Sequence, residues 1–142
     1  MAIPAGGFLR WRKESYVIDD AIGLWDGKRL SAYGKSSECG IYFCGIPFGS
    51  ATALGELKSK SYRGEAETPF TEGRLEIVGQ PLYMTSGEIT CIGATSESIA
   101  LEFDVAVEGD GTGRTRRLTG GIRCRIVPEF EPQFAGIGED NS

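Results

Sequence analysis

Leu101-Glu-Phe-Asp-Val-Ala-Val-Glu108 shows the clearest strand pattern in the chain. Its large apolar side chains recur at every second residue, and carboxylates occupy most of the positions between them. Successive side chains of a β-strand point to opposite faces, whereas a helix needs a spacing of three or four residues. The stretch therefore predicts a half-buried strand, whose inner face carries Leu101, Phe103, Val105 and Val107.

The same alternation continues on the C-terminal side of this strand. Residues 109–113 read Gly-Asp-Gly-Thr-Gly, which predicts the tip of a hairpin. The chain returns through residues 114–127, where apolar residues again alternate with arginines. Gly120-Gly121 interrupts that pattern, and we expect a β-bulge there.

Similar runs lie on the N-terminal side. Residues 8–18 begin with a clear alternation and predict one strand. Asp26-Gly27, between two strand-like runs, predicts a type I′ hairpin turn. Cys39–Cys44 is a short aromatic and β-branched run that predicts a buried strand. From Arg74 the strand pattern resumes, with a further break expected at Ser86-Gly87.

Helical spacing is confined to residues 51–60, where Gly55 interrupts it, so we expect a short helix or helical turn. Roughly eight or nine strands at short spacing are typical of barrels and sandwiches. Without long helices to connect parallel strands, the sheet should be antiparallel. We predict an all-β, single-domain antiparallel β-barrel, lipocalin-like or similar, because closure removes edge strands. A two-sheet β-sandwich is the second choice.

The chain divides into an antiparallel β domain at 1–127 and an acidic tail with prolines and glycines at 128–142. Pro128 and Pro132 cannot donate hydrogen bonds to a sheet. Phe130 and Phe134 are larger apolar groups than a solubilising tail requires. We expect the tail to lie outside the core as a disordered terminus, the alternative being an arm that orders on binding and in which Phe130 and Phe134 contact a partner.

The composition of the chain narrows the kinds of partner and catalytic chemistry that we expect. The net charge is −5 and there is no histidine among the 142 residues. An acidic chain is not attracted to nucleic acids or anionic membranes by its overall field. The missing histidine removes the commonest general base and metal ligand, so no catalytic residue is assigned and no cofactor is expected. The N-terminus lacks the pattern of a signal peptide, and we expect a cytoplasmic protein with no membrane partner.

The four cysteines predict free thiols. Cys39 and Cys44 are spaced C-x4-C, and Cys91 and Cys124 lie far away, so no second pair completes a zinc site. Cysteine also behaves as a small buried hydrophobe, which suits Cys124 on the apolar face of its strand. A cysteine nucleophile would lack a histidine to activate it. We therefore expect no metal.

Basic residues gather in two stretches, 10–13 and Arg114–Arg125. If their strands are neighbours, an acidic protein would carry one basic patch, able to hold phosphate or single-stranded nucleic acid. The alternative is neutralisation across the hairpin, since Glu102, Asp104 and Glu108 lie on the facing strand. We favour neutralisation, which makes a nucleic-acid partner unlikely.

Gly23-Leu24-Trp25, with an arginine on the last strand, resembles the Gly-x-Trp and arginine pair of lipocalin-like barrels. In that family the arginine packs over the tryptophan near the closed end of the barrel. The resemblance covers four residues, and here a whole strand precedes the motif that the family carries on its first strand.

The sequence supports three classes of function. The first is a barrel that binds a hydrophobic small molecule in an aromatic-lined lumen, with a cyclase acting by substrate positioning as its enzymatic variant. The second is a structural protein that forms homo-oligomers through its sheet and C-terminal arm. The third is nucleic-acid or phosphate binding through the Arg114–Arg125 strand. For the first class, the expected ligand-binding residues are Trp11, Trp25, Tyr33, Phe43, Tyr83 and Phe103.

Overall fold

The computed structural model describes residues 6–48, 53–64, 72–77, 80–108 and 115–135. These residues form ten strands of one sheet and two short 3₁₀ turns, η1 and η2. Their bounds are β1 (Gly6–Trp11), β2 (Glu14–Ile18), β3 (Asp20–Trp25), β4 (Leu30–Lys35), β5 (Cys39–Ile46), η1 (Leu54–Leu57), β6 (Ser61–Gly64), β7 (Glu72–Ile77), β8 (Gln80–Ala94), β9 (Ser98–Glu108), β10 (Arg116–Ile126) and η2 (Pro132–Phe134). Within these ranges no helix has the length and apolar character needed to cross a bilayer.

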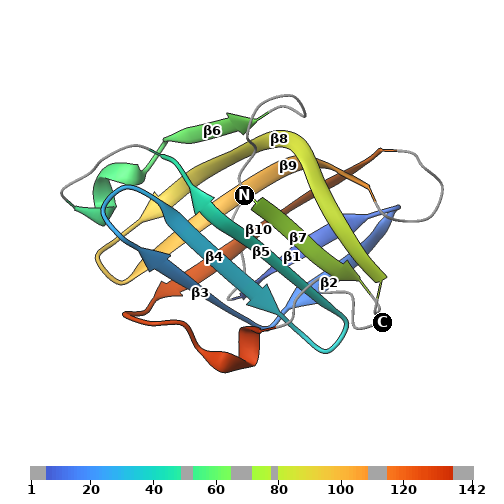
Figure 1. The fold of residues 1–142 in the computed structure, drawn as a ribbon, viewed down its shortest axis with the longest axis horizontal. Coiled ribbons are helices and arrows are strands. Elements are labelled where there is room, and N and C mark those ends of the chain that lie inside the picture. Colours follow the sequence, from blue (N-terminus) through green and yellow to red (C-terminus); the bar gives the residue numbers. More distant parts are fainter. Residues whose placement is uncertain (1–5, 49–52, 65–71, 78–79, 109–114, 136–142) are drawn as a thin grey trace.

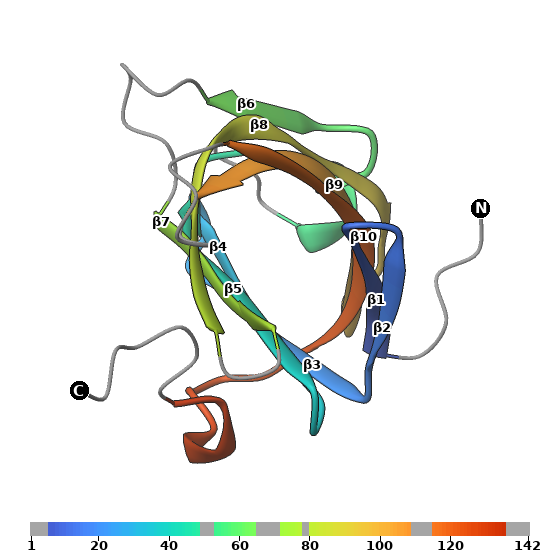
Figure 2. The same cartoon turned by 90° about the vertical axis from the view of Figure 1, so that its right-hand side faces the viewer.

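The sheet curls until its strands form a closed circuit (Figures 1 and 2). Hydrogen-bonded neighbours follow the order β3–β4–β5–β7–β8–β9–β10. β10 then pairs with β3, Arg125 with Ile22 and Ile126 with Gly23, which completes the ring. This short pairing is parallel, and every other pairing among the described strands is antiparallel. The prediction of an all-β barrel is confirmed.

Three strands extend the sheet beyond this ring. β1 pairs with β10 and carries β2 on its outer edge, while β6 pairs with β8. The predicted single strand at 8–18 is therefore wrong, because the chain reverses after Trp11. Arg12 and Lys13 have φ values of 51° and 70°, the positive φ at both central positions that a type I′ turn requires. Neither is glycine, so nothing in the composition marked this turn.

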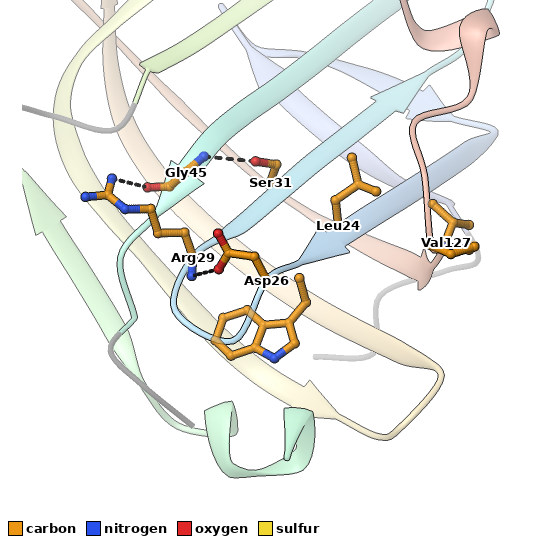
Figure 3. Close-up of a pocket in the computed structure, with 8 residues that line it drawn as sticks. Leu24, Asp26, Arg29, Ser31, Gly45 and Val127 are labelled. Carbon is orange, nitrogen blue, oxygen red and sulfur yellow. Dashed lines mark hydrogen bonds between the residues drawn. The ribbon is translucent and has the colours of Figure 1, made fainter. Parts of the chain in front are cut away.

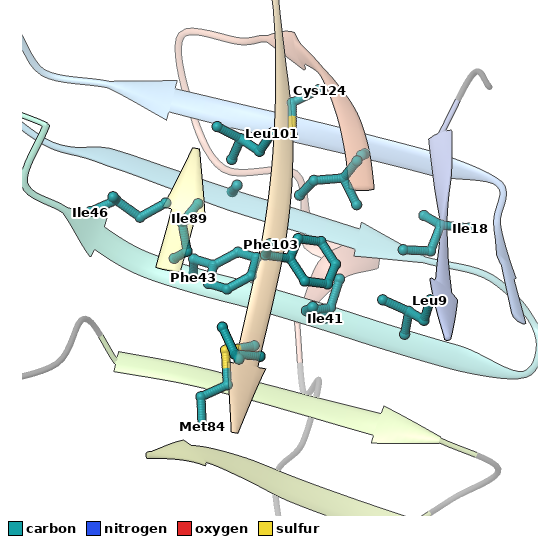
Figure 4. Packing of buried hydrophobic residues seen from close by; sticks show 14 of the residues in the cluster. Leu9, Ile18, Ile41, Phe43, Ile46, Met84, Ile89, Leu101, Phe103 and Cys124 are labelled. Carbon is teal, nitrogen blue, oxygen red and sulfur yellow. The ribbon is translucent and has the colours of Figure 1, made fainter. Parts of the chain in front are cut away.

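β9, the strand with the clearest alternation, has the two faces that its sequence predicts. Leu101, Phe103, Val105 and Val107 are buried, whereas Glu102, Asp104 and Glu108 are exposed. Apolar side chains from all sides of the ring pack against this inner face (Figure 4). The rings of Phe43 and Phe103 meet across the interior at 5.2 Å between centroids, tilted by 59°. The hydrophobic core is thus the barrel interior.

Gly120 and Gly121 do not form the expected bulge. The pairing of β9 with β10 is continuous from Arg116–Val107 to Arg125–Ser98. A Cβ at Gly120 would lie 2.3 Å from the Phe8 carbonyl oxygen and 2.9 Å from Cζ of Phe103. The glycine is there because the Phe103 ring and the β1 backbone occupy the space of a side chain.

Ser86-Gly87 also proves not to end a strand. β8 runs through it from Gln80 to Ala94, with irregular pairing between Met84 and Ser86. Gly87 has a φ of 136°, and a Cβ there would lie 2.5 Å from the Asp104 carbonyl oxygen. The glycine bends a long strand at a point of close backbone approach. The expected short helical turn within 51–60 is present as η1, whose Leu54 and Leu57 are buried.

The C-terminal segment folds back on the outside of the barrel. Phe134 is 2% exposed and shares a second apolar cluster with Ile22 of β3, joined by Tyr33, Tyr42 and Val127. Phe130 lies edge-on to Tyr33 at 5.0 Å and remains 40% exposed. The structure thus places Phe134 against its own sheet, and the contact of Phe130 and Phe134 with a partner stays a prediction. Residues 136–142 of the predicted tail lie outside the described ranges.

Val105→Asp is expected to abolish folding, while Asp104→Val leaves the protein folded. An unpaired carboxylate on the buried face costs several kcal/mol, comparable with the whole stability of a domain at about 5–15 kcal/mol. Asp104 holds Arg117 by two bonds of 2.8 and 2.6 Å in an exposed pair, and ion pairs on the surface contribute little to stability. Urea denaturation followed by circular dichroism measures both. Similar stability of the two variants would contradict the assignment of the faces.

Phe134→Ala is expected to lower the free energy of unfolding by about 3 kcal/mol, the usual cost of removing a buried phenylalanine ring. Phe130→Ala is the matched control, since its ring is partly exposed and its edge contact is worth about 1 kcal/mol. Denaturant unfolding of the full chain gives both values. Equal, small effects would mean that the segment does not dock on the barrel in solution.

Candidate ligand-binding site at one end of the barrel

A surface pocket of about 340 Å³ opens at one end of the barrel, where β3 and β5 finish and β4 begins (Figure 3). The residues after β10 complete its wall. Its lining consists of Leu24, Trp25, Asp26, Arg29, Ser31, Gly45, Val127 and Pro128.

An irregularity in the sheet shapes one side of this pocket. Leu30 pairs with Ile46 and Ala32 with Phe43, so Ser31 alone faces two residues of β5. Such a two-against-one count is a β-bulge, which bends a strand and redirects side chains. Gly45 takes a φ of 71°, and its N–H donates to the Ser31 hydroxyl at 3.0 Å. The serine side chain replaces a sheet hydrogen bond and is thereby fixed in the pocket.

The β3–β4 loop forms another side. The hairpin predicted at Asp26-Gly27 is present, but its loop has four residues because Trp25 pairs with Leu30. Gly27 has a φ of 95°, whereas Asp26 does not have the positive φ of a type I′ turn. One Asp26 carboxylate oxygen accepts the N–H groups of Lys28 and Arg29 at 2.8 and 2.7 Å. These two bonds hold the pKa of Asp26 below its ordinary value.

Arg29 projects from the same loop toward the end of β5 (Figure 3). One guanidinium nitrogen approaches the Gly45 carbonyl oxygen at 3.5 Å, at the long limit for a hydrogen bond. The residue is exposed. Because a guanidinium has five N–H donors, this contact leaves most of its donor capacity free for a ligand.

Apolar groups supply the rest of the lining. Trp25 is partly buried, packs against the main core and also borders the pocket. Leu24 and Val127 lie on the two strands that close the ring or directly after them, and the Val127 N–H donates to the Gly23 carbonyl at 3.0 Å. Polar and apolar groups thus line the pocket in similar measure. A concave surface with apolar walls and fixed polar groups can hold a small molecule. Among the described residues no three side chains of metal-ligating type come together.

The six expected ligand-binding residues do not share one cavity. Phe43 and Phe103 face the barrel interior, and Trp11 belongs to the same core. Tyr33 joins the outer cluster beneath Phe134, and Tyr83 is 40% exposed. Of the six, only Trp25 lines the pocket just described. Alternation shows which residues of one strand share a face, but not which strands curl toward each other.

The interior around these rings is tightly packed. Phe43 and many of its neighbours expose no surface at all, even to an internal space the size of a water molecule. An open cavity would leave such surface on the side chains that line it. Their fully buried companions include Leu9, Ile18, Leu30, Ile41, Ile46, Leu82, Ile89, Leu101, Val107, Leu118 and Ile122.

The lining residues that were not expected from the sequence include Arg29, Ser31 and Val127. Arg29 follows a recognisable turn, so its loop position was accessible to prediction. Ser31 had no signal, because the bulge that directs it depends on how β4 and β5 pair. Val127 reaches the site only through the closure of β10 on β3.

The basic stretches do lie on paired strands, β1 and β10. Two of the arginines are nevertheless engaged by acids, Arg117 by Asp104 and Arg125 by both Asp20 and Glu131. The hydrogen bonds from Arg125 keep the pKa of Glu131 below its ordinary value. The pair of Arg117 with Asp104 is the expected neutralisation across the hairpin, whereas Arg125 is paired by β3 and the C-terminal segment. Arg114 lies outside the described residues.

The likeness to lipocalin-like barrels does not extend to this geometry. The last-strand arginine nearest β3, Arg125, directs its guanidinium to Asp20 and Glu131. Gly23 instead serves the closing seam, since a Cβ there would lie 2.9 Å from Cδ1 of Ile126.

All four cysteines are free, as expected. Cys39, Cys91 and Cys124 are buried, and burial raises the pKa of each of these thiols. A raised pKa suppresses the thiolate form, which is the reactive one. These three cysteines therefore act as core residues.

Comparison of the chain with protein-family models, with curated proteins and with solved structures finds no match.

Asp26 is expected to titrate below the ordinary aspartate range, about 3.9, because two backbone N–H groups bind its charged form. Since the folded pKa is depressed, its contribution to stability is present above the unfolded pKa and is lost as the pH falls through the folded pKa. Carboxyl-detected NMR titration gives the pKa, and the Lys28 and Arg29 amide signals should follow the same midpoint. A midpoint at or above the ordinary value would show that the loop hydrogen bonds do not form.

Proposed function

We propose that the protein binds a small organic molecule with apolar and polar parts in the pocket beside Trp25. The observation that carries this proposal is the pocket itself, whose apolar walls come from Leu24, Trp25 and Val127. Polar side chains of Asp26, Arg29 and Ser31 line the rest of it. Its volume of about 340 Å³ falls within the range of small-molecule sites, about 300–1,000 Å³. The class of function expected from the sequence is kept, while its location moves from the lumen to the end of the barrel.

The packed interior supports this location. A ligand beside Phe43 and Phe103 would have to displace core side chains that touch one another across the barrel. Filling or opening a close-packed core costs several kcal/mol. The end pocket needs no such change, because its walls leave the space free. Cyclisation by positioning would require a ligand enclosed by the protein, so we propose binding and not catalysis.

A homo-oligomer formed through the sheet is the second candidate. Val17 is 64% exposed on β2, which pairs only with β1 among the described strands. An exposed β-branched residue on an edge strand is a natural place for a second chain to pair. Light scattering over a range of concentrations tests this candidate, which a monomer at all concentrations would exclude.

The two tryptophans provide a direct test of the proposed site. They give two indole N–H signals in a ¹⁵N NMR spectrum, and Trp25→Phe identifies the signal that belongs to the pocket. In a screen of small aromatic and aliphatic compounds, we expect ligands that shift the Trp25 indole and the Gly45 amide and leave the Trp11 indole in place. Ligands that shift Trp11 instead would support a lumen site. A screen that moves neither signal would contradict the proposal.

A further inference from the structure

We propose that the ligand of this pocket is an organic anion, an apolar body bearing one carboxylate, and that Arg29 is the residue that anchors the charge. This inference rests on the proposed function of the same pocket. It adds the chemical class of the ligand and the residue that selects it.

The first argument is the state of the guanidinium. Arg29 is exposed, and the one hydrogen bond described for its guanidinium is the 3.5 Å contact with the Gly45 carbonyl. Arg117 and Arg125 contrast with it, since each binds a carboxylate through two nitrogens at 2.6–3.2 Å. A guanidinium matches a carboxylate bidentately, and this geometry adds both affinity and orientation. Among the residues that line the pocket, Arg29 is the cation whose guanidinium can bind a carboxylate in this way.

The second argument is that the Asp26 carboxylate makes its described hydrogen bonds to backbone N–H groups of the loop. Its bonding oxygen accepts two backbone N–H groups within the loop, which keeps the carboxylate on the loop. Figure 3 shows the Arg29 side chain extending away from it, toward Gly45. A ligand carboxylate can therefore meet the guanidinium from the pocket side without replacing an internal partner.

The third argument concerns the remaining polar groups. The Ser31 oxygen already accepts the Gly45 N–H, so its own O–H proton is the group that it offers to a ligand. Arg29 and Ser31 thus offer donors to a ligand, and the Asp26 carboxylate, which also lines the pocket, is already bound by loop N–H groups. The complementary ligand presents acceptors to Arg29 and Ser31. A carboxylate on an apolar body satisfies both the donors and the apolar walls.

The net negative charge of the protein means that any preference for anions arises from contacts within the pocket. At a net charge of −5 the protein does not attract anions at long range. A preference for an anion must then come from contact with Arg29 inside the pocket. Lys28 lies on the same loop and is exposed, but it does not line the pocket. It provides a control with the same change of charge.

The experiment compares two probes of nearly equal shape, 1-naphthoate and its neutral amide, 1-naphthamide. Their dissociation constants are measured by NMR titration of the full chain, with the Trp25 indole and Gly45 amide as reporters. We expect naphthoate to bind at least about tenfold more tightly than the amide, which corresponds to about 1.4 kcal/mol. Arg29→Gln should remove this difference, Arg29→Lys should retain part of it, and Lys28→Gln should change it less than about twofold. Unfolding curves confirm that each variant is folded.

Three outcomes would overturn the inference. Equal binding of the two probes by the unaltered protein would remove the preference for an anion but leave the proposed small-molecule site intact. Equal losses in Arg29→Gln and Lys28→Gln would assign the preference to general charge and not to an anchor. Binding of neither probe would reject this ligand class, and the proposed function would fail with it only if the wider screen also left Trp25 unshifted.

Discussion

The seam where the sheet closes positions the core, the pocket and the C-terminal segment. β10 is the last strand of the ring, and it meets β3 through only two residue pairs, Arg125–Ile22 and Ile126–Gly23. The Val127 N–H extends the seam by donating to the Gly23 carbonyl at 3.0 Å. Gly23 permits this approach, because a Cβ would lie 2.9 Å from the Ile126 side chain. Closure removes the free edges of two strands and encloses the core.

The seam also explains why the interior is filled while its end is hollow. Strands curled into a small barrel direct alternate side chains inward, and large apolar residues fill that volume. Phe43 and Phe103 meet there, with Gly120 leaving room for the second ring. At this end of the ring β3 and β5 finish and β4 begins, and the bulge at Ser31 redirects its side chain. The candidate site is thus a consequence of where β10 leaves the sheet.

The same strand connects the pocket to the C-terminal segment. Val127 and Pro128 line the pocket, and a few residues later Phe134 is buried against the outside of β3. Arg125 binds Asp20 and Glu131 at 2.9 and 2.6 Å, which ties this segment to β3 and β10. Lys35 adds a bond to the Gln133 carbonyl at 2.7 Å. One wall of the candidate site is therefore positioned by a docked segment and not by the sheet alone.

Local sequence patterns predicted the fold class and which residues of a strand share a face. The alternation in β9 and the short spacing of strands reflect local geometry, since a strand has a period of two wherever it occurs. Only the tertiary structure decided the contents of the barrel, the burial of Phe134 and the position of the pocket. Tyr33 and Phe43 are both aromatic residues in strands, yet one lies outside the barrel and the other inside. Alternation within β4 accounts for Tyr33, which shares its face with Ser31 and Lys35. The position of the pocket depends instead on the pairing of β4 with β5 and on the β10–β3 seam. Both are contacts between residues far apart in the chain, which alternation along a single strand does not fix.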